Sequence, residues 1–318
     1  MSNTTNKKIR SKILLRYWYI LVVLVVLVVF PKKALASSSS LEIYPPIIQI
    51  KAIAPVILKT PIIIKNPGEQ TEVFTISLKP FTQSDEQNGQ VRYLKDKEFD
   101  FADPLMLQRI KVLEDDIEIS QVELAPKQQK QLKITIDIPE GEIASDYYFS
   151  LLFTSTPPTT DELKNKSNIL TAVATNILLT IGKEEKAQVK IEEFETSFFK
   201  DSGQIDFKLK AANTGGQFIS TRGYILITNI FGQTVGRVDL APVNILANTS
   251  RITAAAWKEN LFMGFYTATL SLQFGENETE IKTVTHFIGA PVQILVIALI
   301  VISLFLLVRS KLKHRLRR

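Results

Sequence analysis

The chain has 318 residues, no cysteine, two histidines and a formal net charge of +6. The absence of cysteine excludes thiol nucleophiles, disulfides and cysteine-ligated zinc. The charge excess sits at the two ends. Residues 1–36 hold seven basic side chains and residues 309–318 hold six, with no acid in either, so the middle carries 38 − 13 = 25 basic residues against 32 acidic ones. A middle with a net charge of −7 does not suggest nucleic-acid binding.

The first 36 residues have the pattern of an export signal. Basic residues from Lys7 to Arg16 precede an apolar run, Tyr17 to Phe30, and Ala34-Leu35-Ala36 has the small-residue form of a cleavage site. We expect cleavage after Ala36, so that Ser37 begins the mature chain. Two lysines just before the cleavage site leave a retained signal anchor open as the alternative.

Strand patterns dominate the middle of the chain. Residues 131–138 and 204–210 alternate apolar and polar side chains throughout, and residues 72–78 nearly do so. Such period-two runs, separated by Gly, Pro and Asn turn signals, predict half-buried strands. The predicted fold is therefore all-β, with two immunoglobulin-like antiparallel β-sandwiches. We place the first domain at 37–183, with long inserts near 80–104 and 155–167, and the second at 184–287.

A weak internal repeat supports the two-domain division. Each half has an early Asn-x-Gly turn, at Asn66 and at Asn213, and each has a late strand with tyrosines near its start. In immunoglobulin-like sandwiches a tyrosine corner lies two residues before the second disulfide cysteine. In this chain the positions of that cysteine would be Ser150 and Ala268. Small residues in place of the cysteine fit an immunoglobulin-like domain without a disulfide.

The C-terminal segment predicts a membrane anchor. Residues 288–308 are apolar apart from Gln293 and Ser303, and a helix of that length would be roughly 30 Å long, which matches the hydrocarbon thickness of a bilayer. A basic tail follows at 309–318, and basic residues stay on the cytoplasmic side. The expected topology is single-pass type I, with the middle of the chain outside the cell membrane. The residues expected to fix this topology are Arg309, Lys311, Lys313, Arg315, Arg317 and Arg318.

The chain offers few residues for catalysis. The histidines are His286, at the predicted membrane edge, and His314, in the tail, so a Ser-His-Asp site is not expected. We expect no catalytic residues, no cofactor and no metal site. An acidic run at 96–103 departs from EF-hand spacing and reads as a solvated loop, with calcium binding left open. A pair of converging carboxylates, as in a glycosidase, stays open as an alternative that no pattern in the sequence favours.

Three aromatic residues in the first insert are candidate partner contacts. Tyr93, Phe99 and Phe101 lie in a polar, acidic stretch, where aromatic side chains can anchor a partner. The alternative is a small apolar cluster that folds back under a long loop.

The order of segments resembles the bacterial WxL-interacting protein family. Local patterns are similar as well: Ile64-Lys65-Asn66-Pro67-Gly68 and Ile138-Pro139-Glu140-Gly141 in the first domain, and Asn213-Thr214-Gly215-Gly216 with Phe231-Gly232 in the second. The resemblance implies a cell-surface protein whose first domain contacts peptidoglycan and whose second contacts a partner surface protein. The first domain also resembles in outline the PapD-like pilus chaperones.

The expected function is that of a membrane-anchored bacterial cell-surface binding protein without enzymatic activity. Its expected partner is cell-wall glycan (peptidoglycan) or another surface protein. The first alternative is a membrane-tethered, PapD-like assembly chaperone for secreted or surface subunits, which predicts an exposed edge strand in the first domain. Further alternatives are a wall-active hydrolase and a structural subunit of an envelope complex. The sequence leaves the ligand and the oligomeric state open.

Overall fold

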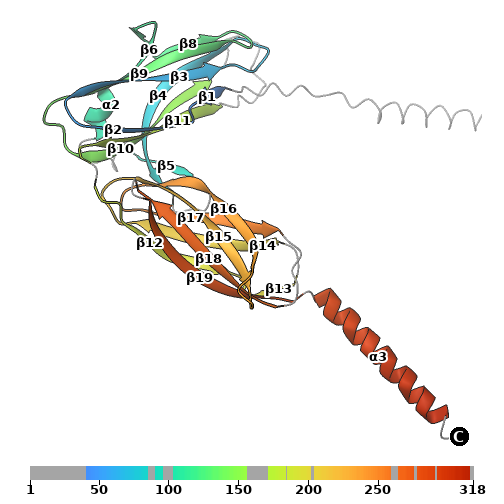
Figure 1. The fold of residues 1–318 in the computed structure, drawn as a ribbon. Coiled ribbons are helices and arrows are strands. Elements are labelled where there is room, and N and C mark those ends of the chain that lie inside the picture. Colours follow the sequence, from blue (N-terminus) through green and yellow to red (C-terminus); the bar gives the residue numbers. More distant parts are fainter. Residues whose placement is uncertain are drawn as a thin grey trace, which may run out of the picture. The chain divides into compact units, whose positions relative to one another are not determined.

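The computed structural model describes residues 41–84, 90–95, 103–155, 171–183, 185–201, 204–258, 264–275, 278–290 and 292–315. Most of these residues lie in strands, which confirms the predicted all-β class. The strands form two sandwiches that, together with the C-terminal helix, belong to one compact unit (Figure 1). The predicted signal peptide, with Ala36 and Ser37, lies outside the described residues.

The first sandwich consists of two facing sheets. One sheet has the order β1 (Glu42–Tyr44), β3 (Val56–Lys65), β9 (Gln129–Ile138), β6 (Ile110–Glu114) and β7 (Ile117–Glu118). The other, called sheet B, has the order β2 (Ile47–Ala52), β11 (Ala172–Ile181), β10 (Ser145–Ser155), β4 (Glu72–Gln83) and β5 (Val91–Tyr93), and β8 (Gln121–Leu124) also pairs with β4. A short helix, α2 (Asp103–Gln108), precedes β6.

Alternation along these strands builds the first core. In β9 the buried side chains are Leu132, Ile134, Ile136 and Ile138, and the intervening residues face outward. They pack with Phe74, Phe149 and Phe153 from sheet B. The predicted alternating segment 131–138 is therefore confirmed as a strand with one buried face.

The second sandwich has a smaller and a larger sheet. The smaller has the order β12 (Val189–Thr196), β14 (Gln204–Asn213), β17 (Ser250–Lys258). The larger, called sheet E, has the order β13 (Phe199–Lys200), β19 (Thr279–Gly289), β18 (Gly264–Phe274), β15 (Ile219–Asn229), β16 (Thr234–Ile245). Stacked and edge-on rings of Phe207, Tyr266 and Phe287 fill the core between them. The predicted boundary at 183/184 falls between β11 and β12.

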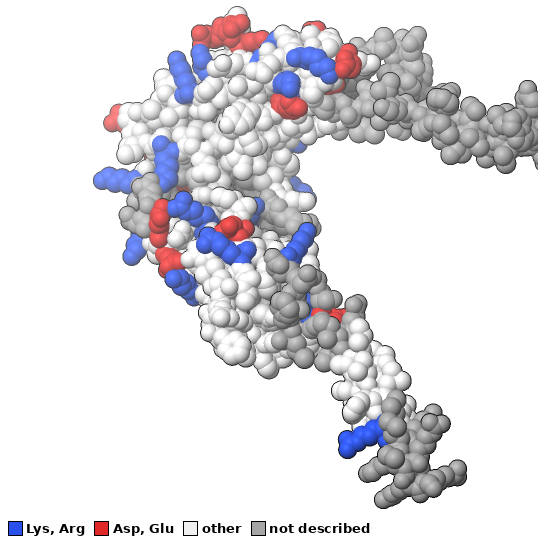
Figure 2. All heavy atoms as spheres, turned by 45° about the vertical axis from the view of Figure 1, so that its right-hand side comes forward, with Lys and Arg blue, Asp and Glu red and all other residues white. Residues whose placement is uncertain are grey.

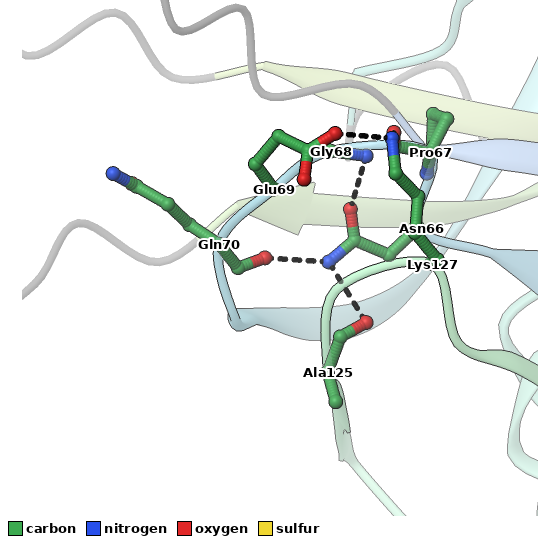
Figure 3. Close-up of polar contacts among 7 residues, drawn as sticks. All are labelled: Asn66, Pro67, Gly68, Glu69, Gln70, Ala125 and Lys127. Carbon is green, nitrogen blue, oxygen red and sulfur yellow. Dashed lines mark hydrogen bonds and ion pairs between the residues drawn. The ribbon is translucent and has the colours of Figure 1, made fainter.

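Each sandwich has a buried asparagine at the same kind of corner. Asn66 contacts the carbonyl oxygens of Gln70, Leu124 and Ala125 through Nδ2, at 2.7, 3.1 and 3.2 Å. Figure 3 shows the contacts with Gln70 and Ala125, and the N–H of Gly68 that donates to Asn66 Oδ1. Lys127 closes the same turn by donating to the Pro67 carbonyl oxygen and pairing with Glu69.

Asn213 repeats the arrangement in the second sandwich. Its Nδ2 contacts the carbonyl oxygens of Gln217, Ile245 and Leu246, and its Oδ1 accepts from Gly215 N–H at 2.9 Å. A carbonyl buried at a strand end needs a donor, and here three carbonyl oxygens share the two N–H groups of one amide. The repeated Asn-x-Gly turn seen in the sequence therefore marks equivalent corners of the two sandwiches.

The C-terminal helix begins later than predicted. Ile288 and Gly289 belong to β19, where they pair with Phe265 and Gly264, so the predicted start at Ile288 is wrong. The helix α3 (Val292–Arg315) follows, and its side chains are described for residues 296–307 and for Arg309. Across the residues that the structure describes, no helix combines the length and apolar character needed to cross a bilayer. A spanning segment at 288–308 is therefore not confirmed.

Candidate binding groove

Strand β2 forms one edge of sheet B. It pairs in parallel with β11, the Asn176 N–H donating to the Pro46 carbonyl oxygen at 3.0 Å and the Gly182 N–H to the Ala52 carbonyl oxygen at 2.8 Å. In a parallel ladder alternate residues bond to the neighbour, so the main-chain groups of Ile47 and Gln49 point away from β11. Among the described residues, no strand pairs with β2 on that outer side.

The side chains of β2 divide between two environments. Ile48, Ile50 and Ala52 turn toward the first core, and the alternate residues Ile47, Gln49 and Lys51 turn away from it. This outward row borders two hollows between the sandwiches. One, of about 140 Å³, is lined by Ile47, Phe81, Leu178 and Leu246 among others; the other, of about 230 Å³, is lined by Gln49, Lys51, Glu185 and Phe218 among others. We call the outward row and its two hollows the β2 groove.

An apolar cluster fixes one wall of the groove. Phe81 and Leu178, on the outer face of sheet B, pack against Phe218 and Leu246 of the second sandwich. Sheet B is thus buried on both faces at this point, which explains the nearly continuous apolar sequence at the end of β11. Gln49 Nε2 donates to Asn244 Oδ1 at 3.3 Å, and Gln49 lines only the larger hollow.

A buried polar network reinforces the same junction. Asp146 Oδ1 accepts from Thr180 Oγ1 at 2.7 Å, and its Oδ2 accepts from the Tyr148 hydroxyl and from the Phe218 N–H. The Tyr148 hydroxyl accepts in turn from the Ala247 N–H at 3.0 Å. Burial, and after it the neighbouring Asp146 carboxylate, raises the pKa of Tyr148 well above its ordinary value, so the hydroxyl keeps its proton.

The Gln83 side chain makes a second polar link between the sandwiches. Its Oε1 accepts from Thr249 Oγ1 at 3.2 Å and from the Leu246 N–H at 3.4 Å, while its Nε2 donates to the Ser250 carbonyl oxygen. Together with the Asp146 network, these bonds hold the walls of the groove in place before any partner arrives. A rigid groove beside outward main-chain groups can pair with an extended polypeptide as an added strand.

Of the three residues predicted from sequence as partner contacts, the structure describes Tyr93, which lines neither hollow of the β2 groove. Tyr93 is in β5 opposite Phe81, and its side chain is 37% exposed. Phe99 and Phe101 lie outside the described residues, as do the acidic residues 96–102 and Arg317 and Arg318. Tyr93 therefore remains a predicted contact, and calcium binding at the acidic run remains untested. Of the residues predicted to fix the topology, Arg309 is exposed on α3, whose backbone continues through Lys311, Lys313 and Arg315.

The predicted disulfide-equivalent position in the first domain is wrong. Tyr147 and Phe149 face the core, so Ser150 faces the other way, and its hydroxyl donates to Asn176 Oδ1 at 2.6 Å. The tyrosine that bonds back to its own loop is Tyr147, which donates to Glu142 Oε1 at 3.1 Å, whereas Tyr148 contacts the second sandwich. In the second domain Ala268 does face the core.

The β2 groove was not identified from the sequence. Its signal is nevertheless present: a short apolar strand, residues 47–52, lies between Pro45-Pro46 and Pro55 and contains a lysine. Prolines and lysines beside a short strand are features of sheet edges. The hollows themselves depend on residues more than a hundred positions away, which no local pattern reveals.

Comparisons with known proteins identify neighbours in fold. No family model matches the chain, and no curated protein matches it, so membership of the WxL-interacting family is not shown. Among solved structures, a chaperone–tip adhesin complex of CFA/I fimbriae is 12% identical, with a TM-score of 0.39, over 79% of this chain and 100% of that chain. The E. coli chaperone DraB is 11% identical, with a TM-score of 0.38, over 79% of this chain and 97% of that one.

A human protein also contains a similar domain. The ASH/PapD-like domain of human CEP192 is 12% identical, with a TM-score of 0.31, and is matched over 49% of this chain and 94% of that chain. At such identities and TM-scores, function has to be argued from the geometry of this chain itself.

Proposed function

We propose that the protein is a non-enzymatic binding protein that captures an extended segment of a partner protein along the β2 groove. One observation carries the proposal. The main-chain groups of Ile47 and Gln49 point outward from β2, and the outward side chains of the same strand line two hollows. Main-chain hydrogen bonds would supply affinity, and side chains entering the hollows would supply selectivity.

The proposal includes attachment at a bacterial cell surface. Its support is the apolar sequence 288–308 with the basic tail behind it, and the export-type pattern of residues 1–36. The partner would then be a secreted or surface protein. An assembly chaperone is the special case in which that partner is a subunit awaiting incorporation.

A photo-crosslinking amino acid in place of Ile47 tests the proposal in intact cells. We expect it to capture one protein through one extended segment, while the same replacement at Ile117, an exposed position on β7, does not. A synthetic peptide of the captured segment should then bind the isolated full chain. Retention on purified peptidoglycan with no peptide binding would instead favour the glycan interpretation.

Two substitutions at one position separate main-chain pairing from side-chain contact. Gln49→Pro removes an outward N–H and blocks strand addition, and we expect it to weaken peptide binding about tenfold or more, since each net hydrogen bond contributes about 1 kcal/mol and the ring adds a steric clash. Gln49→Ala removes the same side chain but keeps the N–H, so it should bind within about threefold of the parent protein. Equal losses in both variants would contradict strand addition.

A further inference from the structure

One end of sheet E carries a row of exposed apolar side chains. Phe199 of β13 pairs with Ile288 of β19, and Ile288 pairs with Phe265 of β18. Residues directly opposite one another share a face of a sheet, so these three side chains lie on the same face. The neighbours in sequence, Tyr266 and Phe287, fill the core, which means that the row faces outward.

The turn between β15 and β16 extends this row. Asn229 pairs with Tyr266 in the antiparallel register, so the next residue, Ile230, lies beside Phe265. The Asn229 side chain fixes the turn, because its Oδ1 accepts from the N–H groups of Phe231 and Gln233 at 3.0 Å. We call this set of side chains the apolar end: Phe198, Phe199, Ile230, Phe231, Phe265 and Ile288. All except the half-buried Ile288 are between 52% and 79% exposed.

A polar row follows the apolar end on the same face. The next residues on the same face are polar, and Thr267 Oγ1 lies 3.1 Å from His286 Nδ1. Further along the sheet come Lys282 and Glu280, which form an ion pair at 3.0 Å. Apart from Leu226 and the 53% exposed Val284, which lie between these two levels, the outer face changes from apolar to polar to charged with distance from the end, as expected for a surface at a boundary between two media.

The chain leaves the second sandwich at this same end. The Ala290 N–H donates to the Lys200 carbonyl oxygen at 2.9 Å, and α3 begins at Val292. The described part of α3 is white in Figure 2, that is, uncharged, up to a basic side chain near its end. From residue 296 to 307 its side chains are exposed on all sides, and only Ser303 among them is polar.

We propose that the apolar end lies against the surface of a lipid bilayer, with its phenylalanine and isoleucine side chains in the headgroup region. Lipid is favoured over a partner helix or a second copy because residues 296–307 of α3 are apolar on all sides except at Ser303, whereas a protein partner needs only one apolar stripe. The basic residues in the last two turns of α3, which begin at Arg309, suit anionic lipid. The inference rests on the proposed membrane attachment and adds the contact surface to it.

The absence of cysteine makes a direct test straightforward. Single-cysteine variants Phe231→Cys and Phe265→Cys of the full chain would carry the fluorophore NBD, and Ile117→Cys, exposed on the first sandwich, is the matched control. The proteins are reconstituted into vesicles of phosphatidylcholine and phosphatidylglycerol. Flotation measures attachment, and quenching by lipids with a nitroxide near the headgroup measures contact.

We expect all three variants to float with the vesicles, and only the labels at 231 and 265 to shift to the blue and lose most of their emission to the quencher. Flotation with all three labels equally exposed to water would overturn the contact and leave attachment standing. Failure to float would overturn both. A blue shift that depends on protein density and resists the lipid quencher would assign the surface to a second copy, which also overturns the proposal.

Discussion

The two sandwiches have the same buried asparagine at their corners, but they differ in how far their sheet edges are covered. Asn66 and Asn213 each contact three carbonyl oxygens and accept one glycine N–H. In the second sandwich the two sheets approach each other along both sides, β16 near β17 and β12 near β19, whose outer side the two-residue β13 covers only at its end. In the first sandwich β2 pairs with β11 and turns its other side outward. The asparagine corner is therefore common to both sandwiches, and the uncovered outer side of β2 distinguishes the first.

A glycine makes the closed edge of the second sandwich possible. Gly236 of β16 lies against the indole ring of Trp257 in β17, and a Cβ built on it would come within 2.5 Å of that ring. Closing facing edges in this way protects main-chain groups from pairing with another chain. The contrast is that the neighbouring edges of the second sandwich shield each other, whereas among the described residues no strand covers the outer side of β2.

The largest expected effect is at the shared corner. Asn66→Asp and Asn213→Asp keep the side-chain shape but replace a donor by a carboxylate oxygen facing three carbonyl oxygens. Each should destabilise its own sandwich by about 3 kcal/mol or more, because buried acceptors lose their donor and meet a charge. Hydrogen-exchange mass spectrometry resolves the two sandwiches separately, and Gln121→Glu, on the exposed part of β8, is the control. Very unequal losses would contradict the equivalence of the corners.

The open edge can be tested by proline substitution at adjacent positions of β2. Ile50 turns its main-chain groups toward β11, so Ile50→Pro removes a ladder bond and should cost about 2–3 kcal/mol. Gln49 turns its N–H outward, so Gln49→Pro should cost less than about 1 kcal/mol. Urea unfolding compares the two variants. Equal costs would mean that the outer side of β2 is not open.

The closed edge should respond to a single methyl group. Gly236→Ala forces β16 away from Trp257, and we expect a loss of about 1.5 kcal/mol with a red shift of the Trp257 emission. Gly264→Ala is the control in the same sandwich, because the nearest atom to its new Cβ is a Tyr266 ring carbon at 3.9 Å. A Gly236→Ala protein as stable as the control, with unchanged emission, would contradict the importance of this contact.

Sequence patterns predicted what alternation and turn chemistry determine. The strand at 131–138 and the paired Asn corners follow from local rules, because side-chain period and Asn-x-Gly turns are properties of short segments. Which of the adjacent Tyr147 and Tyr148 faces the core was harder to predict. Either could face the core, and only the packing of the second sandwich against Tyr148 decides between them. The helix start was misplaced because the last residues of β19, Phe287 to Gly289, are apolar and lead into the apolar start of α3 almost without a polar break.

The smallest expected effect concerns the junction between the two sandwiches. Tyr148→Phe leaves the Ala247 N–H without its acceptor and should cost about 1 kcal/mol at neutral pH. Because the folded protein raises the pKa of Tyr148 above its ordinary value of 10.0, the unfolded chain loses this proton first as the pH rises. The stabilising contribution is therefore complete below pH 10 and declines above it. Stability measured from pH 8 to 11 should fall more steeply for the parent protein than for Tyr148→Phe, and parallel curves would show that the hydroxyl is not buried at the junction.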